Sequence, residues 1–348
     1  MQAEDHTTRD LADLLAKSRE ASWHNFGKRI RFYAPSFLRY ENRFYNAPSL
    51  AFSSISITGN TCGLGCKHCQ GQVLETMIPA QTPLELLATC KELYTKGCRG
   101  VLISGGCLQN GSIPFEPFIE TISRIKREMG FTIIIHTGII KIGIAKKLAQ
   151  AGVDAALIDV IGSDKTIKDI YRLNITTKDY EDSLEALEES GMAVIPHVIV
   201  GLQYGRLLGE SEALDMISRH RPNGVVVIAL IPIKGTPMEN SPVPEPTDIA
   251  FILAEAKLKM PKIPVALGCM RPTGKHRVLT DVMAVDAGVN GIAFPAEEAI
   301  HHAEKLGLNV SFSPFCCSQI FEDLRIPRAE DIFEAQREGE IFGASNSY

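Results

Sequence analysis

Short apolar runs alternate with longer amphipathic segments along most of the chain. The amphipathic segments carry apolar residues at three- and four-residue spacing and end in Gly, which is typical of helices. The apolar runs between them are rich in β-branched residues, which is typical of strands. Eight strands are predicted on this basis: Ser53–Thr58, Gly100–Gly106, Thr132–Gly138, Ala155–Val160, Ala193–Gly201, Gly224–Pro232, Ile263–Cys269 and Asn290–Pro295.

The alternation of strand and helix predicts βα repeats around a parallel sheet. Eight repeats fit a TIM-type barrel, in which the chemistry lies at the C-terminal ends of the strands. A doubly wound sheet is the alternative. We expect a helical N-terminal extension over residues 1–50, the barrel over 51–300 and a C-terminal extension over 301–348. This last segment contains a ninth strand-like run, Leu308–Phe315, and a frayed tail.

Composition narrows the class of protein. The chain has 348 residues, 45% hydrophobic and 22% charged, which is enough for one large α/β domain. A net charge of −5 offers no basic face for nucleic acid, and no apolar run of about 18 residues could span a membrane. The polar N-terminus resembles neither a secretory signal nor a transit peptide. We therefore expect a cytoplasmic protein with neither a nucleic-acid nor a membrane partner.

Nine cysteines, unevenly clustered, suit metal or catalytic thiols in a reducing compartment better than a disulfide framework. The stretch "NTCGLGCKHCQGQ" places Cys62, Cys66 and Cys69 within eight residues and without a fourth cysteine. Structural zinc usually takes four ligands, so three thiolates leave one coordination position open. Cys90 and Cys98 are expected to be ordinary buried thiols.

The other cysteines follow the ends of predicted strands. Cys107 follows the second strand, Cys269 ends the seventh, and Cys316 and Cys317 follow the ninth run. Because the C-terminal ends of barrel strands meet at one mouth, we expect these thiols to converge there. Soft thiolates favour iron–sulfur clusters, zinc or Cu(I).

The C-x3-C-x2-C spacing after the first strand of a βα barrel resembles the radical SAM superfamily. The resemblance implies that the three thiolates hold a [4Fe–4S] cluster and that S-adenosylmethionine (SAM) chelates the fourth iron. Reduction then cleaves SAM to methionine and a 5′-deoxyadenosyl radical that abstracts a substrate hydrogen, while the protein orients the cofactor and excludes water. An electron donor such as ferredoxin or flavodoxin is implied as a partner.

The same resemblance implies SAM-binding roles for several residues. His68 stands where the family commonly has an aromatic residue against adenine. Gly105 and Gly106, in "SGGC", stand in the place of the GGE motif that meets the methionine amino group, with Cys107 replacing the acid. Asp159 resembles the residue that holds the ribose.

Gly201, in "VIVGLQYG", resembles the fifth-strand motif beside adenine, with the motif's acid displaced to Glu210.

Three segments resemble the biotin synthase group in particular: Tyr171–Met192, Ile231–Glu239 and Val265–Pro295. Within them, Lys178 takes the place of a basic residue that pairs with the SAM carboxylate. Arg271 falls on the family's seventh-strand arginine, near an auxiliary cluster.

Other positions depart from biotin synthase. The places of its auxiliary [2Fe–2S] cysteines read Ser104, His136 and Ile195, so that cluster is not expected. We expect instead a second [4Fe–4S] cluster whose ligands come from the set Cys107, Cys269, Cys316 and Cys317. One cysteine of the adjacent pair is expected to ligate, and the sequence does not distinguish which.

The motifs "LISGGC", "LGCMRP" and "FCC" resemble the subunits of the two-component lipoyl synthase. The leading hypothesis is sulfur insertion into an octanoyl chain on a lysine of a lipoyl-acceptor protein, together with a second radical SAM subunit. Cys107, Cys269 and Arg271 would take part in the sulfur chemistry. The alternatives are a biotin-synthase-like maturase of the hydrogenase or pyrrolysine type, and a non-catalytic iron–sulfur carrier.

Overall fold

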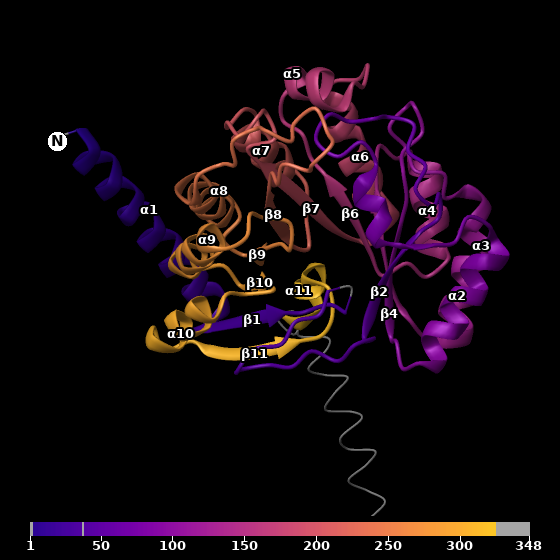
Figure 1. Ribbon diagram of the computed structural model, residues 1–348, viewed down its shortest axis with the longest axis horizontal. Coiled ribbons are helices and arrows are strands. Elements are labelled where there is room, and N and C mark those ends of the chain that lie inside the picture. Colours follow the sequence, from indigo (N-terminus) through magenta and orange to yellow (C-terminus); the bar gives the residue numbers. More distant parts are fainter. Residues whose placement is uncertain (1–2, 37, 325–348) are drawn as a thin grey trace, which may run out of the picture.

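The computed structural model describes residues 3–36 and 38–324, which form an α/β fold around one curled parallel sheet (Figure 1). The sheet order is β11-β1-β10-β9-β8-β7-β6-β5-β4-β2-β3. The strands are β1 (Arg29–Tyr33), β2 (Phe52–Ser56), β3 (Ile78–Pro79), β4 (Gly100–Ser104), β5 (Thr132–Thr137), β6 (Ala155–Asp159), β7 (Ala193–Val200), β8 (Val225–Ala229), β9 (Val265–Leu267), β10 (Gly291–Ala293) and β11 (Asn309–Ser313).

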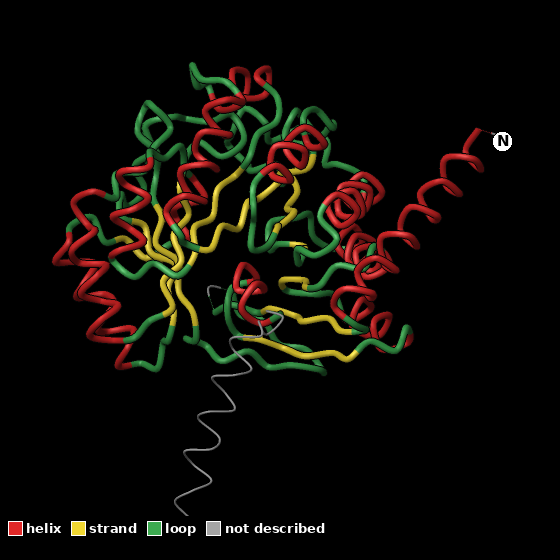
Figure 2. The backbone as a smooth tube through the Cα atoms, turned by 180° about the vertical axis from the view of Figure 1, so that it is seen from behind, coloured by secondary structure: helices red, strands yellow, loops and turns green. Residues whose placement is uncertain are grey.

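Helices cover the outer face of the curled sheet (Figure 2). The α-helices are α1 (Ala3–Phe26), α2 (Pro83–Thr95), α3 (Ile119–Met129), α4 (Ile142–Gln150), α5 (Asp164–Thr166), α6 (Thr177–Ser190), α7 (Glu210–Arg219), α8 (Pro246–Lys259), α9 (Lys275–Asp286), α10 (Glu297–Lys305) and α11 (Ile320–Asp323). Short turns are η1 (Gln72–Thr76), η2 (Glu116–Phe118) and η4 (Cys317–Gln319), all 3₁₀, and a π turn, η3 (Ile167–Tyr171).

The strand order confirms the predicted barrel architecture. From β4 to β10 each strand pairs in parallel with the next one along the chain, as in a barrel and unlike a doubly wound sheet. All eight predicted strands are present. Among the described residues the sheet ends at β11 and β3 without hydrogen bonds between these two edges, so the barrel is open on one side.

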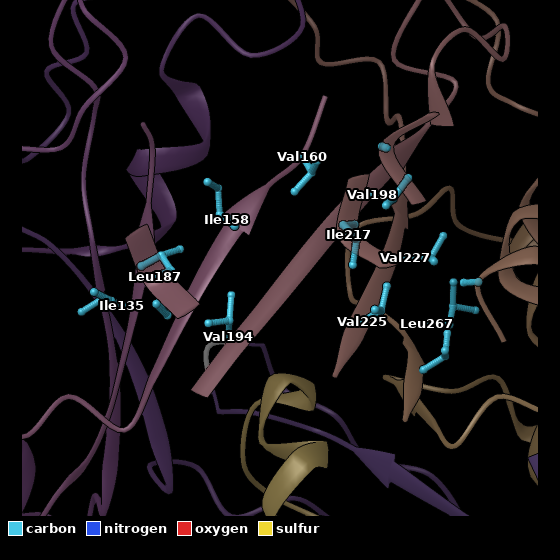
Figure 3. Packing of buried hydrophobic residues seen from close by; sticks show 14 of the residues in the cluster. Ile135, Ile158, Val160, Leu187, Val194, Val198, Ile217, Val225, Val227 and Leu267 are labelled. Atoms are coloured by element: carbon cyan, nitrogen blue, oxygen red, sulfur yellow. The ribbon is translucent and has the colours of Figure 1, made fainter. Parts of the chain in front are cut away.

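Alternate residues along each strand face two apolar layers. On β5, Ile135 packs between the sheet and the helices, whereas Ile134 faces the barrel interior. On β8, Val227 and Val226 divide in the same way. Figure 3 shows the outer layer, where Leu187 of α6 packs with residues of the sheet. This two-sided burial explains why the strands read as continuous apolar runs.

The N-terminal extension contains a strand in addition to the expected helix. β1 joins the sheet between β10 and β11, with Arg31 opposite Gly291 on one side and Ser311 on the other. Its sequence, "RIRFY", alternates arginines with the buried Ile30 and Phe32, so it lacks the apolar run that marks the other strands.

The C-terminal segment turns from β11 into the barrel interior. The predicted ninth run is β11, and the chain then forms η4 and α11, which lies in the opening between β10 and β2 in both views (Figures 1 and 2). A Cβ at Gly291 would lie 2.9 Å from Ile320 Cδ1, so this glycine makes room for the inserted segment. Asp323 holds this segment in place: its carboxylate accepts a hydrogen bond from the Tyr33 hydroxyl (2.8 Å) and forms an ion pair with Arg31 Nε (3.0 Å).

The inserted segment carries Cys316 and Cys317 into the inner apolar layer. The tail predicted to fray lies outside the described residues. No helix among the described residues is both long enough and apolar enough to cross a membrane.

Candidate iron–sulfur site in the barrel mouth

A cavity of about 320 Å³ opens at the C-terminal ends of the strands. Its wall combines the loop after β2, the ends of β4, β5 and β6, and the segments that follow β8 and β9. The side chains that line it include Cys62, Cys66, His68, Cys69, Gly105, Gly106, Cys107, His136, Asp159 and Tyr171. Most of the predicted SAM-binding residues therefore meet at one place.

The cysteine loop presents its three thiols to this cavity. Cys66 and Cys69 are 4% and 8% exposed, and Cys62 is half-buried. The ligand atoms of Cys66, His68 and Cys69 lie within 4.8 Å of one another. Three free thiols that face one cavity fit a [4Fe–4S] cluster with an open fourth position.

Backbone hydrogen bonds shape this loop. Gln70 N–H donates to the carbonyl of Cys66 (2.9 Å) and Gln72 N–H to that of Cys69 (2.9 Å). A hydrogen bond with Cys66 lowers the pKa of the Cys69 thiol, and His68 lowers it further, whereas the same bond raises the pKa of Cys66. The bond between the two thiols therefore favours the thiolate form at Cys69, which is the form that binds a metal.

Gly106 allows the loop to approach the end of β4. A Cβ at this position would lie 2.6 Å from Cys62 Cα, and Gly106 N–H donates to Thr58 Oγ1 (2.6 Å). A Cβ on Gly105 would lie 3.0 Å from the same hydroxyl oxygen. The close packing of the cysteine loop on the end of β4 therefore requires glycine at position 106, while Gly105 packs tightly against Thr58.

Cys107 lies beside the cysteine loop. Its carbonyl accepts a hydrogen bond from Gly63 N–H (2.7 Å), and Cys62 Sγ lies 4.0 Å from the same oxygen. Burial raises the pKa of the Cys107 thiol to about 12, with the charges of Cys62 and Asp159 adding to the shift. Cys107 therefore lines the cavity beside the cysteine loop and is not part of the inner apolar layer.

Three polar side chains lie on the neighbouring strands β5, β6 and β7, and two of them, His136 and Asp159, line the cavity. Asp159 Oδ1 on β6 lies 3.3 Å from His136 Nε2 on β5, and the His136 ring stacks on that of His197, with centroids 5.4 Å apart. Burial opposes their ionisation, but mutual attraction outweighs it, so the Asp159 pKa is lowered and the His136 pKa raised. Burial lowers the His197 pKa to about 4. His197 was not among the residues predicted for the site.

Cys269, Cys316 and Cys317 form a second group. All three pack in or against the inner apolar layer, and η4 contacts β8, β9 and β10 there. The Cys269 pKa is raised to about 11, mainly by burial and next by the charge of Cys316, which places these two thiols near each other. Among the described residues, however, only Cys66, His68 and Cys69 bring three ligand atoms within 4.8 Å.

Lys178 lies away from the cavity. It is in the first turn of α6, its side chain is 67% exposed, and its Nζ lies 2.5 Å from Asp182 Oδ1. Gly201 has a left-handed φ of 75°, and its N–H donates to the buried carboxylate of Glu210 (2.8 Å). It too lies outside the cavity wall, although its neighbours Ile199 and Leu202 belong to it.

Arg271 is fully buried, and its guanidinium makes four hydrogen bonds within the chain. Its guanidinium donates to both Asp281 oxygens (2.6 and 2.8 Å) and to the carbonyls of Gly268 (2.6 Å) and Phe294 (3.3 Å). These contacts tie the segment after β9 to α9 and β10. In the structure, Arg271 therefore holds together the segments that follow β9 and β10, and helix α9.

Because this ion pair is fully buried, Asp281→Ala leaves an unpaired guanidinium and should lower the free energy of unfolding by about 3 to 5 kcal/mol. Denaturant unfolding followed by circular dichroism measures this loss. Asp182→Ala, which removes the partner of Lys178 on an exposed helix face, is the matched control and should leave stability nearly unchanged. Equal losses of stability in the two variants would contradict a stabilising role for the buried Arg271–Asp281 ion pair.

Comparisons with known proteins agree with this geometry. Residues 56–204 match the family model of the radical SAM superfamily. Biotin synthase of Buchnera aphidicola subsp. Acyrthosiphon pisum (strain APS) is 30% identical over 254 residues, covering 69% of this chain and 70% of the relative. That of Marinobacter nauticus is 26% identical over 307 residues, covering 81% and 83%.

Two solved structures share the fold. Methylornithine synthase (PylB) has a TM-score of 0.60 at 17% identity, covering 90% of this chain and 91% of that one. The [FeFe]-hydrogenase maturase HydG has a TM-score of 0.62 at 14% identity, covering 95% and 74%.

Proposed function

The chain belongs to the radical SAM superfamily, with biotin synthases among its relatives, and from this membership we propose that it inserts sulfur into an unactivated aliphatic chain. The substrate is an octanoyl group on a lysine of a lipoyl-acceptor protein. The chain acts as one subunit of a two-component lipoyl synthase, beside a second radical SAM subunit and an electron donor such as ferredoxin or flavodoxin.

The observation that carries this proposal is the character of the cavity wall. Beyond the cysteine loop the wall is largely aliphatic, and among the described residues it includes no Lys or Arg. The imidazole of His136 also lines the cavity and its pKa is raised, but it already faces the carboxylate of Asp159, so a free substrate carboxylate buried there would find no cation of its own, which is costly. An acyl chain joined to a protein by a neutral amide has no such charge. Representative wall residues are Leu102, Ile113, Ile199, Ile228, Leu230 and Ile231.

Residues of this chain supply binding, orientation and exclusion of water. Cys62, Cys66 and Cys69 hold the [4Fe–4S] cluster, which together with SAM supplies a hydrogen-abstracting radical when bound. The aliphatic wall fixes the acyl chain beside the cysteine loop and keeps water from the reacting carbon.

The thiols of the inner apolar layer are candidate ligands for the cluster that would supply the sulfur. Leu102 and Ile228 line the cavity and also pack against the inner layer that holds Cys269, Cys316 and Cys317, so the two regions adjoin. We place a second [4Fe–4S] cluster there as the sulfide donor. A hydrogen bond from Cys317 lowers the pKa of Cys316 and raises that of Cys317, which favours Cys316 as the ligand of the pair. Cys107, at the rim, is the remaining candidate ligand.

The test compares substrates at constant SAM and reductant. With the second subunit present, release of 5′-deoxyadenosine should rise when an octanoylated lipoyl-acceptor protein is added, and should not respond to free octanoate. Stimulation by a free amino acid instead would favour the maturase alternative. If no 5′-deoxyadenosine is released under any condition, the non-catalytic iron–sulfur carrier is the alternative that remains.

A further inference from the structure

Seven buried side-chain polar atoms of the described residues have no hydrogen-bond partner. Three of them, His68 Nδ1, Asp159 Oδ1 and Tyr171 OH, belong to side chains that line the same cavity. Asp159 Oδ1 has an ion-pair neighbour in His136, whereas His68 Nδ1 and Tyr171 OH have no hydrogen-bond partner in the part of the chain that the structure describes. Buried polar groups in native proteins are nearly always paired, so a cluster of unpaired ones around a cavity indicates a polar ligand. The resemblance in sequence gave roles to His68 and Asp159, and it gave none to Tyr171.

Tyr171 is held in place by an unusual turn. It ends the π turn η3, where Arg172 N–H donates to the carbonyl of Ile167, and Arg172 then adopts a left-handed φ of 59°. Single π turns are rare and are frequently found at functional sites. The side chain of Tyr171, at the end of this turn, lines the cavity, and the residue is only 9% exposed.

The same turn packs directly on the cysteine loop. Lys67 N–H donates to the carbonyl of Ile170 (2.9 Å), and Cys66 Sγ lies 3.8 Å from the carbonyl oxygen of Tyr171. The Tyr171 ring lies 5.2 Å from the His68 ring, centroid to centroid, at an interplanar angle of 56°. The position of the phenol is therefore tied to the loop that binds the cluster.

We propose that the Tyr171 hydroxyl binds the ribose diol of SAM together with Asp159. The chemistry of the two side chains is complementary, since a carboxylate only accepts hydrogen bonds whereas a phenol also donates. Each hydroxyl of a vicinal diol can donate and accept. Asp159 accepts from one ribose hydroxyl, and Tyr171 donates to the other.

This inference rests on SAM binding and not on the proposed sulfur insertion, so the two can fail separately. It assigns Tyr171 as a SAM-binding residue whose effect is on affinity. Tyr171→Phe removes only the hydroxyl and keeps both the ring beside His68 and the main-chain carbonyl near Cys66. The iron content and the cluster absorbance should therefore be unchanged.

The expected result is a roughly tenfold rise in the SAM dissociation constant of Tyr171→Phe, measured by equilibrium dialysis on the reconstituted protein. Tyr180→Phe is the matched control, because Tyr180 is similarly buried, at 5% exposed, but lies outside the cavity wall. It should bind SAM as the wild type does. An unchanged affinity in Tyr171→Phe would overturn the proposal.

SAM analogues that lack the 2′- or the 3′-hydroxyl identify the contact. The analogue without the hydroxyl that Tyr171 binds should have the same affinity for the wild type and for Tyr171→Phe. Equal losses for SAM and for both analogues would mean that the phenol acts through its neighbours, and would refute direct binding. A test on the wild type alone does not depend on the stability of the variant. If both analogues bind to the wild type as tightly as SAM does, the proposed binding of the ribose diol is refuted.

Discussion

Alanine at any of Cys62, Cys66 and Cys69 is expected to abolish the reductive cleavage of SAM. Each thiol lines the cavity, and a cubane with three protein ligands cannot be held in its working position by two. The loop lies at the rim of the barrel rather than within the sheet, so the fold should persist. Release of 5′-deoxyadenosine under anaerobic, reducing conditions measures the loss, and circular dichroism measures the fold.

The matched control for this experiment is Cys90→Ala. Cys90 is a fully buried thiol of α2 and lies outside the cavity wall. Its replacement should lower stability somewhat while leaving iron content and SAM cleavage intact. Continued production of 5′-deoxyadenosine by the triple variant at the three loop cysteines would refute a radical SAM cluster at this site.

Removing Cys269 and Cys316 together is expected to separate SAM cleavage from sulfur transfer. If both ligate a second cubane, iron should fall from about eight to about four per chain. SAM cleavage should survive, because the loop of the first cluster is untouched, while sulfur transfer to an octanoylated acceptor should be lost.

The Cys90→Ala, Cys98→Ala double variant is the control, since it removes two buried thiols that lie outside the cavity wall. Cys107→Ala, tested alone, shows whether the rim thiol belongs to the second cluster or only neighbours the first. If iron stays near eight per chain without Cys269 and Cys316, these two thiols do not hold the second cluster. If the wild type itself binds only about four iron per chain, there is no second cluster, and the maturase alternative moves ahead of lipoyl synthesis.

Local pattern was sufficient for the barrel but not for all of its strands. β4 to β8 are buried on both faces, so their apolar runs mark them in the sequence. β1 was missed because arginines alternate with its buried residues, and one of them, Arg31, is neutralised by Asp323, almost three hundred residues away in the chain. A pattern of neighbouring residues cannot predict an ion pair between two residues so far apart in the chain.

The same limit applies to the site. The cysteine spacing identified the loop, because three ligands in eight residues meet by local geometry alone. The environment of Arg271 depends on its ion pair with Asp281, and that of Tyr171 depends on a π turn. A resemblance between sequence motifs predicts neither of these features. The sequence placed Cys107 with Cys269 because both follow strands, but packing separates the rim thiol from those in the inner layer.

The most direct test of sulfur insertion follows the sulfur atom itself. The protein is reconstituted with sulfide carrying a heavy sulfur isotope and is incubated with SAM, reductant, the second subunit and an octanoylated lipoyl-acceptor protein. Mass spectrometry of the acceptor should show heavy sulfur in place of hydrogen on the octanoyl chain. An acceptor that stays free of sulfur while 5′-deoxyadenosine accumulates would contradict the account.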